Sequence, residues 1–518
     1  MAFIRKTKIS GHTYLYLVTN RWVNGKVKQK FLGYLGREEK LPLLLEKCLP
    51  LQKIQDVEIE NLLYQTPVSL WILMEQMEIP SLMKARFSKK WGVDAATVAG
   101  VMIINYATDR HTKNTLHDWY AQTWLPQLLK VAPEKMNKDL LCRTMDFFTE
   151  KEIEDIHAEV FKKVAEKFGL SNEYLFYDIT DVTFEGSECS LAKHGYNSRH
   201  EYCPQINLAM PVTAERFPVA HKVFEGNTKD AKTLDASLKL VEKTGIVSKT
   251  VFVFDRGIST NANFALIESK GAQFICGYTK NSRVKTLIAA LKPEQFTPIN
   301  EDISFHETTE EKRRLLFFWS KKLQEEQADF RQKRIKKIED KLAKLAKTAS
   351  RYAPSRLHER IGMICGSYRK FFDIQTTPTF SYQIKPAVLV KTVAVEGKYA
   401  ILTNTKLKPD EVLSHYRDRN FVEMSFKDLK LFVDMRPVRH WKDRRVLAHI
   451  FLAVLAFGLR SLLQLKLRRA GLEISSEEAI NQLNKVRVLS ANGKILRLTG
   501  QTEYTKKIVA VIETQCKN

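Results

Sequence analysis

The chain has 518 residues, of which 44% are hydrophobic and 27% are charged, a composition typical of globular proteins with several domains. These values exclude a wholly disordered chain and a fibrous repeat. The 83 Lys and Arg residues outnumber the 59 Asp and Glu residues and leave a formal net charge of +24, which favours a polyanionic partner, most simply nucleic acid.

A membrane partner is not expected. The longest clean apolar run covers residues 450–459, about half of the roughly 20 residues that a spanning helix needs. The first six residues become polar too early for the apolar core of a signal peptide. The seven cysteines are scattered and never spaced C-x-x-C, which predicts neither a disulfide framework nor a zinc site. We therefore expect a reduced, cytoplasmic protein.

Residues 1–40 are predicted to form a β segment. Residues 14–18 and 27–35 have strand-like patterns, and Asn24-Gly25 between them is a tight-turn dipeptide. Lys and Arg residues are interleaved with the strand residues, which fits either a small solvated sheet or a hairpin that contacts DNA.

Residues 41–169 show helical patterns and are predicted to form a helical, DNA-binding region. One helix is expected to begin near Thr149, because its side chain can cap the helix and acidic residues follow in the first turn. Helices alone do not show that the region binds DNA.

Short apolar runs bounded by Gly, Asn and Pro begin after residue 170 and alternate with helical patterns, which predicts an α/β sheet. Residues 170–285 and 396–470 are predicted to be two parts of this core, interrupted by residues 286–395. The basic tail, 471–518, has no clear pattern. The predicted strands cover residues 174–184, 205–212, 219–223, 250–254, 273–278 and 398–402, and helices are predicted at 233–244 and 261–270.

The interrupting segment contains a strongly charged predicted helix at residues 320–347. Ile335, Ile338, Leu342 and Leu345 follow one another at steps of 3, 4 and 3, which fits a short coiled-coil seam. This helix is a candidate for pairing two copies of the chain. Its lysines are typical of a solvated face, with DNA contact as the alternative.

Two aspartates lie in or after apolar strand patterns. Asp178 is expected in the middle of a core strand, where a carboxylate is costly unless a partner such as a cation compensates it. Asp255 ends the run 251–254, at the edge where open α/β sheets bind ligands. The simpler alternative for Asp255 is a helix cap or a turn acid.

A third acid, Glu423, belongs to a predicted helix. At 100° per residue, Tyr416, Arg419, Glu423 and Lys430 share an arc of about 60°, while Val422, Phe426, Leu429 and Phe432 occupy another sector that suits packing on the sheet. The alternative interpretation is an ordinary solvated face. Carboxylates on two strands and a helix can hold two Mg²⁺ ions about 4 Å apart, an arrangement suited to displacement at phosphorus.

Together these residues resemble a known family. The order Asp178, Asp255, Glu423, with Tyr416-x-x-Arg419-x-x-x-Glu423-x-x-x-x-x-x-Lys430, is similar to the Y-R-E-K signature of bacterial insertion-sequence DDE transposases. The resemblance is to the superfamily named after insertion sequence four, and within it to the "sixteen thirty-four" group. Supporting blocks lie at residues 31–36, 177–180, 225–228, 254–257 and 436–441. The segment His200-Glu201-Tyr202-Cys203-Pro204 departs from the expected basic-acidic pair before a proline.

The resemblance implies an RNase H-like catalytic core with an insertion domain between the second and third acids. It implies cleavage of donor DNA at terminal inverted repeats and joining of 3′-hydroxyl ends to target DNA, with hairpin intermediates associated with the Y-R-E-K signature. It further implies Mg²⁺, for which Mn²⁺ can substitute, double-stranded DNA as partner, a homodimer in the DNA complex, and a cytoplasmic, nucleoid-associated location.

The resemblance also implies roles for individual residues. Asp178, Asp255 and Glu423 would be the catalytic metal ligands, and the residues expected to contact DNA are Tyr416, Arg419, Lys430, Arg256 and Trp441. Trp441 could stack on an extruded base, although a core position is the simpler interpretation of it. Asp181 is the rival for the first ligand, but strand alternation turns it away from Asp178. Glu185 and Asp230 are interpreted as surface acids.

Two other functions remain open from the sequence. A decayed transposase could occupy the repeats as a repressor without chemistry, although all three acids are present. A two-metal nuclease selective for branched DNA could use the same core without joining ends.

Overall fold

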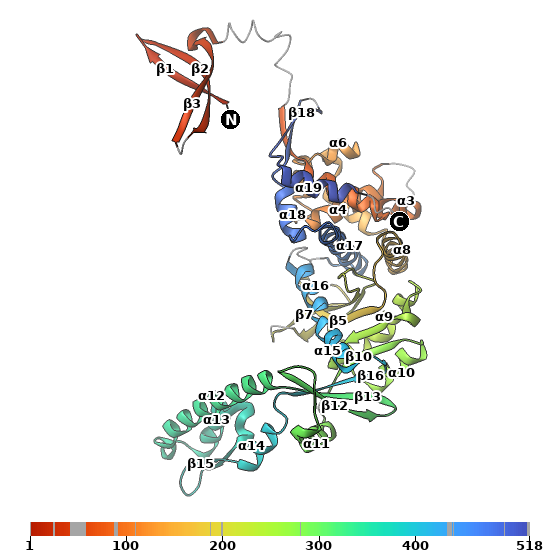
Figure 1. Cartoon of the computed structure of the whole chain (residues 1–518), viewed down its shortest axis with the longest axis vertical. Helices are drawn as coiled ribbons and strands as arrows, with labels where there is room; N and C mark the ends of the chain where they lie inside the picture. Colours follow the sequence, from red (N-terminus) through yellow and green to blue (C-terminus); the bar gives the residue numbers. More distant parts are fainter. Residues whose placement is uncertain are drawn as a thin grey trace. The chain divides into compact units, whose positions relative to one another are not determined.

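The computed structural model describes residues 2–23, 26–41, 59–87, 92–108, 110–186, 188–197, 200–279, 281–431, 438, 440–491 and 493–514. The predicted Asn24-Gly25 turn, Phe432 and residues 436, 437 and 439 of the block at 436–441 lie outside these residues. The chain divides into two compact units, Met1–Asn61 with Val488–Leu498, and Leu62–Arg487 with Thr499–Asn518. Figure 1 labels their elements.

The first unit begins with a three-stranded antiparallel sheet of β1 (Ala2–Ile9), β2 (His12–Val23) and β3 (Lys26–Arg37), followed by η1 (Glu38–Lys40). Three strands therefore lie within residues 1–40. Leu15 and Val18 are buried among the side chains that the structure describes in this sheet, and neither the solvated-sheet nor the DNA-contact interpretation is tested by it. A second small sheet, in the order β18-β17-β4, is formed by β4 (Ile59–Leu63), β17 (Arg487–Ala491) and β18 (Lys494–Thr499).

The second unit contains the predicted helical region. The side chain of Thr149 caps α8 as expected and accepts a hydrogen bond from the Glu152 N–H at 3.3 Å. The helices are α2 (Gln65–Gln76), α3 (Ile79–Arg86), α4 (Ala95–Ala107), α5 (Leu116–Ala121), α6 (Leu125–Leu129), α7 (Lys138–Met145) and α8 (Glu150–Phe168).

A long apolar helix, α17 (Asp443–Arg469), packs against α2, α4, α7 and α8 (Figure 1). By length and composition it could cross a membrane, but 94% of its most apolar stretch is buried inside the protein. We therefore interpret it as a core helix. The tail that the sequence left unassigned contributes α18 (Ser476–Leu483) and α19 (Glu503–Glu513), which pack on α17 and α2.

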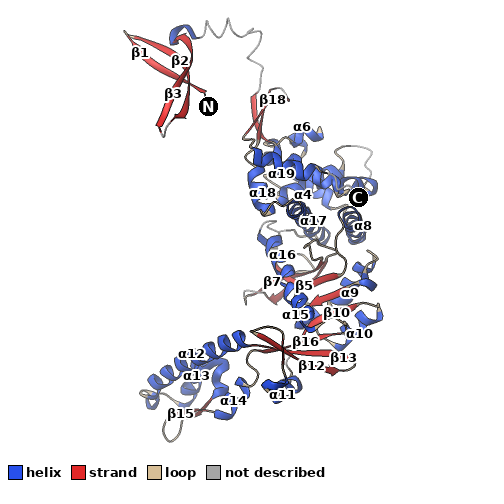
Figure 2. Ribbon diagram, viewed as in Figure 1, coloured by secondary structure: helices blue, strands red, loops and turns tan. Residues whose placement is uncertain are grey.

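A ten-stranded mixed sheet forms the other part of this unit (Figure 2). Its order is β11-β12-β13-β16-β10-β9-β5-β7-β6, with β8 also paired to β7; β5, β9 and β10 are parallel and the other pairs are antiparallel. The α/β prediction is confirmed, and the mixed sheet is consistent with an RNase H-like core. The strands are β5 (Tyr174–Thr183), β6 (Lys193–Tyr196), β7 (Tyr202–Val212), β8 (Lys222–Glu225), β9 (Val251–Phe254), β10 (Gln273–Tyr278), β11 (Thr297–Pro298), β12 (Ile303–Glu310), β13 (Arg313–Ser320) and β16 (Lys398–Thr403).

Helices connect these strands: α9 (Leu234–Glu242) precedes β9, α10 (Asn261–Ser269) precedes β10, and α11 (Ser282–Ala290) follows it. The structure of residues 286–320 differs from the prediction. We expected these residues to interrupt the sheet, but β11, β12 and β13 extend it. The reason is a buried apolar run at residues 315–318 that pairs with β16. Short 3-10 helices lie at η3 (Pro133–Lys135), η4 (Asp230–Lys232), η5 (Val247–Lys249), η6 (Arg256–Ile258), η7 (Pro293–Gln295), η8 (Ala349–Arg351) and η9 (Gly366–Phe371).

The charged helix α12 (Lys321–Ala346) begins a segment with its own apolar core. The four seam residues of α12 are buried in this core, and α12 packs against α13. The seam is therefore occupied within the chain and is not free to pair two copies. The other elements of this segment are α13 (Pro354–Cys365), β14 (Phe372–Gln375), β15 (Ser381–Ile384) and α14 (Pro386–Val393).

The predicted helix that carries the four-residue signature is two helices. α15 (Pro409–Asp418) ends at Arg419, and α16 (Asn420–Leu431) begins directly after it. Val422, Phe426 and Leu429 are buried as predicted, and α16 packs against β5.

Candidate active site

Asp178 lies in the middle of β5, between β7 and β9 in the sheet. Phe176, two residues earlier, packs edge-on against Phe421 of α16 with 5.8 Å between ring centroids. Since side chains two apart share one face of a strand, Asp178 is on the face that α16 covers. Its carboxylate accepts a hydrogen bond from the Ile179 N–H at 2.8 Å.

Asp255 directly follows β9, as the sequence predicted. Its carboxylate caps η6 by accepting a hydrogen bond from the Arg256 N–H at 2.7 Å. In the parallel ladder Tyr177 is paired with Phe254, so Asp178 and Asp255 are the next residues on two strands that lie about 4.8 Å apart. The simple interpretation of Asp255 as a capping acid is thus correct, and it does not exclude a second role.

Arg419, at the junction of α15 and α16, connects the acids. Its Nη1 lies 2.7 Å from Asp255 Oδ1 and its Nη2 lies 2.9 Å from Glu423 Oε1. The arginine side chain is only 17% exposed, whereas those of Asp255 and Glu423 are 41% and 53% exposed. Arg419 Nε is buried and makes no hydrogen bond to the described residues. One guanidinium therefore brings two of the predicted acids together.

Tyr416 completes this group. Its hydroxyl donates to Asp255 Oδ1 at 3.4 Å, and the Arg419 guanidinium lies 5.4 Å from its ring centroid. Burial raises the pKa of Tyr416 to about 12, so the hydroxyl stays protonated near neutral pH. A side chain at Gly277 of β10 would collide with this hydroxyl, which explains the glycine there.

Burial raises the pKa of Asp178 to about 7. The Ile179 N–H and the charge of Arg419 oppose this rise, while the charges of Asp255 and Glu423 add to it. The interactions between these charges show that all three acids share one electrostatic environment. A carboxylate in this position gains from a nearby cation, because a positive charge offsets the free-energy cost of burying the charged form.

The three acids fit a divalent cation chemically, but they do not yet form a coordination shell. In the part of the chain that the structure describes, no three His, Cys, Asp or Glu side chains converge closely enough to hold a metal ion. The Arg419 guanidinium instead supplies the positive charge between Asp255 and Glu423. Carboxylate oxygens are the hard ligands that Mg²⁺ prefers, so this donor set suits a cation that takes the place of the guanidinium.

Lys430 is placed differently from the other signature residues. Its Nζ lies 3.8 Å from Asp181 Oδ2, and the two side chains are only 11% and 14% exposed. The sequence grouped Lys430 with Tyr416, Arg419 and Glu423 along one stripe, whereas the structure gives it a separate, mostly buried ion pair. Asp181, the rival metal ligand, is engaged in this pair.

The two remaining predicted DNA contacts lie on the surface. Arg256, next to Asp255, is exposed. Trp441 is 64% exposed, so the interpretation of Trp441 as a core residue is wrong, and base stacking stays a prediction.

Sequence reasoning missed Asp230 as a neighbour of the site. It lies at the start of η4, against Gly257 of η6. Burial raises the pKa of Asp230, and the charge of Asp255 adds to the rise. The available signal was its position two residues after the block at 225–228. Asp230 is exposed, as expected for a surface acid, and it is also a neighbour of Asp255.

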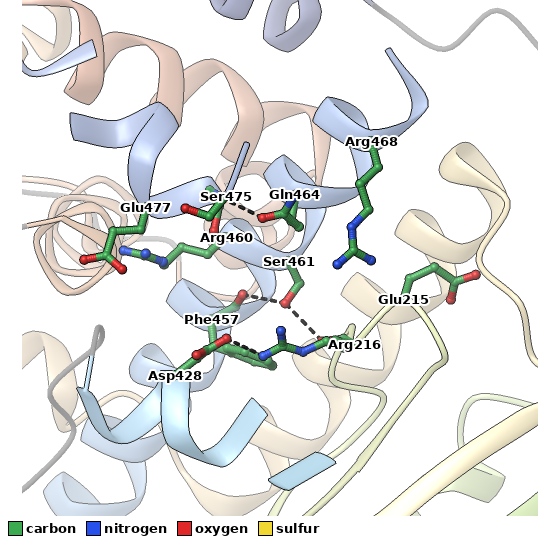
Figure 3. A pocket seen from close by; sticks show the side chains of 11 residues that line it. Glu215, Arg216, Asp428, Phe457, Arg460, Ser461, Gln464, Arg468, Ser475 and Glu477 are labelled. Carbon is green, nitrogen blue, oxygen red and sulfur yellow. Dashed lines mark hydrogen bonds and ion pairs between the residues drawn. The ribbon is translucent and has the colours of Figure 1, made fainter. Parts of the chain in front are cut away.

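Arg216 was also missed, and it fixes the helix that carries Glu423. It lines a cavity of about 210 Å³ between the β7–β8 loop, α16 and α17 (Figure 3). Its guanidinium contacts Asp428 Oδ2 and donates to Ser425 Oγ at 3.3 Å, both on α16. Its carbonyl accepts a hydrogen bond from Ser461 Oγ of α17 at 3.0 Å. Arg216 thus ties α16 to the core helix.

One comparison with known proteins identifies a family. A family model described as a transposase DDE domain matches residues 171–459, which is more than half of the chain and includes all three acids. No curated protein matches the chain.

Proposed function

This chain belongs to the DDE transposase family, and on that premise we propose that it cuts donor DNA at the terminal inverted repeats of a mobile element and joins the 3′-hydroxyl ends to target DNA. Members of the family act on DNA and generally use divalent metals. The observation that carries the proposal is the position of Asp178, Asp255 and Glu423, which come from two adjoining strands and one helix and share the charge of Arg419.

In this proposal Asp178, Asp255 and Glu423 hold the metal, Mg²⁺ with Mn²⁺ as a substitute. Two such ions, if bound there, would supply the positive charge that stabilises the attacking and leaving oxygens of an in-line displacement at phosphorus. Arg419 neutralises a phosphate of the bound DNA once its carboxylate partners are taken, and the buried Tyr416 hydroxyl donates a hydrogen bond beside it.

The surface residues then bind DNA around the cut. Arg256 contacts a phosphate next to Asp255, and Trp441 stacks on an extruded base. Lys430 reaches a phosphate when it leaves Asp181. In its finer classification, the chain is proposed to belong to the Y-R-E-K group of the superfamily named after insertion sequence four, with hairpin intermediates, a dimer in the DNA complex and a location in the cytoplasm at the nucleoid.

The Asp255→Asn variant tests this function. The substrate is a labelled duplex that carries the inverted repeats flanking the gene, where a direct duplication outside the repeats would mark the element. We expect the variant to bind this duplex nearly as well as the unmodified chain and to lose cleavage in Mg²⁺. The Asp235→Asn variant, on the exposed side of α9, is the matched control and should cleave normally. Equal cleavage by Asp255→Asn would contradict the assignment.

A repressor without chemistry is the second candidate. It is favoured by one observation, the Arg419 bridge that holds Asp255 and Glu423 in place of a coordination shell. Incubation with labelled ends and Mn²⁺ separates the two functions. Nicking supports the transposase, and complete absence of nicking at every time point supports the repressor. Cleavage of unrelated branched DNA without end joining would instead identify a nuclease.

A further inference from the structure

A strongly basic cleft lies in the second unit, outside the group of acids. It has a volume of about 610 Å³ and is formed by the end of α4, the segment before α5, the start of α7 and the start of α17. The described residues that line it include no Asp or Glu. Its cationic lining residues are Arg110, Lys113, Lys138, Lys442 and Arg445.

One cation of the cleft is paired with an acid that lies outside its lining. Asp146, which is not a lining residue, binds Arg445 through two hydrogen bonds of 2.7 and 2.6 Å. Lys138 and Lys442 are exposed. Burial lowers the pKa of Lys113 to about 8, and the charges of Arg110, Arg445 and Lys138 lower it further, against a rise caused by Cys142. Like charges crowded in a concave surface indicate an anionic ligand.

Two further features of the cleft favour a phosphate. His440 is 8% exposed, lines the cleft, and its Nε2 makes no hydrogen bond to the described residues. The cleft also lies at the N-terminus of the 27-residue helix α17, with Lys442 as its N-cap, and helix N-termini attract anions. The exposed ring of Trp441 adds an aromatic surface at the same place.

The cleft is connected to the strand that carries Asp178. Val438 forms a parallel bridge with Phe184, directly after β5, and its N–H donates to the Thr183 carbonyl at 3.3 Å. Six residues of extended chain from Asp178 to Phe184 span about 20 Å. DNA that is cut at the three acids would therefore reach the bridge between Phe184 and Val438 within one turn of the double helix, which is about 34 Å long.

We propose that this cleft binds the phosphodiester backbone of DNA away from the cleaved bond. The inference rests on the proposed function in so far as DNA is the substrate. The cations and the N-terminus of α17 bind phosphates, and the His440 Nε2, which has no partner among the described residues, meets a phosphate oxygen. The site orients the DNA, and the chemistry stays with the three acids.

The test compares two triple variants of the full chain in EDTA, so that cleavage plays no part. Lys113→Gln/Lys138→Gln/Lys442→Gln alters the cleft, and the control Lys151→Gln/Lys162→Gln/Lys249→Gln removes the same charge from exposed residues elsewhere. Binding of a fluorescein-labelled 30-base-pair duplex and of a 30-residue single-stranded oligothymidylate is measured from 50 to 300 mM KCl. Thermal unfolding verifies that both variants are folded.

We expect the slope of log affinity against log salt to become shallower by about 2–3 for the cleft variant, since each phosphate contact contributes about 0.9 on duplex DNA and about 0.7 on a single strand. The control should change it by less than one. A change with the duplex alone assigns the site to double-stranded DNA, and a change with the single strand alone assigns it to an unpaired strand. Equal slopes for the two variants would overturn the proposal.

A second measurement needs no variant. Cys142 lines the cleft, and Cys203 is similarly half-buried but lies on β7. We expect DNA to slow alkylation of Cys142 by iodoacetamide several-fold and to leave Cys203 unaffected, as read by peptide mass spectrometry. If saturating DNA does not slow the alkylation of Cys142, this result would also refute the proposed DNA-binding site. Because neither readout requires metal, a chain that binds in this way but never cleaves would contradict the proposed function and leave this inference standing.

Discussion

Arg216 lies far from Glu423 in the sequence, yet it holds the helix on which Glu423 is placed. Its partners on α16 are Asp428 and Ser425, and its carbonyl is bound by Ser461 of α17. The Arg216→Met variant keeps the length of the side chain and removes the charge and the hydrogen bonds. We expect α16 to dock more weakly and cleavage to fall, although Arg216 is a positioning residue that does not contact the acids.

The magnitude follows from the burial of the pair. Hydrogen bonds to charged groups contribute roughly 1.5–3 kcal/mol when they are protected from water. The Arg216 and Asp428 side chains are 16% and 30% exposed, so solvent screening reduces this to about 1–2 kcal/mol. A change of 1.4 kcal/mol corresponds to about tenfold in an equilibrium constant, and amides of α16 should therefore exchange about 5- to 30-fold faster.

A double-mutant cycle isolates this interaction. Arg216→Met, Asp428→Asn and the double variant are unfolded in urea, and hydrogen exchange of α16 is followed in parallel. We expect a coupling free energy of about 1–2 kcal/mol and faster exchange in α16 than in α8. A coupling near zero, together with unchanged exchange in α16, would refute the view that Arg216 positions this helix.

Three other outcomes can be checked. Gly277→Ala should destabilise the protein by about 1–3 kcal/mol, because its methyl group collides with the Tyr416 hydroxyl and lies tightly against its ring; adding Tyr416→Phe should restore part of the stability in thermal unfolding, and no recovery would contradict this contact. Asp181→Asn should strengthen DNA binding, because it removes the negative charge that pairs with Lys430, and Lys430→Ala should reduce the salt slope by about 0.9; an unchanged affinity and an unchanged slope would make the pair purely structural. Burial lowers the pKa of His157 to about 4, so below pH 6.5 this histidine is protonated in the unfolded chain before it is protonated in the folded one, and the free energy of unfolding falls as the pH falls from 6.5 towards 4. Between pH 7 and 5 the free energy of unfolding in urea should fall by about 2 kcal/mol more for the unmodified chain than for His157→Gln. Equal decreases would show that His157 is not buried as a neutral ring.

Local sequence patterns predicted the strands and helices around the site well. The short apolar runs around Asp178 and before Asp255 are confirmed as β5 and β9, because short runs rich in aromatic and β-branched residues suit a strand that is buried in a sheet. Their parallel register, which makes the two acids neighbours, depends on pairing between distant strands. Alternation along a strand predicts which of its side chains share a face of the sheet, but it does not predict which other strand pairs with it.

The parts of the site that were missed depend on tertiary contacts. The break at Arg419, its bridge between Asp255 and Glu423, and the pairing of Lys430 with Asp181 join residues from different elements. Periodicity placed four side chains on one stripe and could not say which strand faced each of them. The exposure of Trp441 was missed for the same reason, since a tryptophan among charged residues carries no periodic signal.

The contact between α2 and α19 joins two segments that the ribosome synthesises at very different times. Gln76 Nε2 donates to the Ile512 carbonyl at 2.8 Å, across 436 positions of sequence, and Lys466 Nζ contacts both Gln76 Oε1 and the Ile512 carbonyl. At about 5–20 residues per second, a ribosome needs roughly 20–90 seconds to supply the second partner after the first. During that interval the apolar side of α2 is not yet packed against α19, so chaperones can bind the nascent chain until α19 has been synthesised.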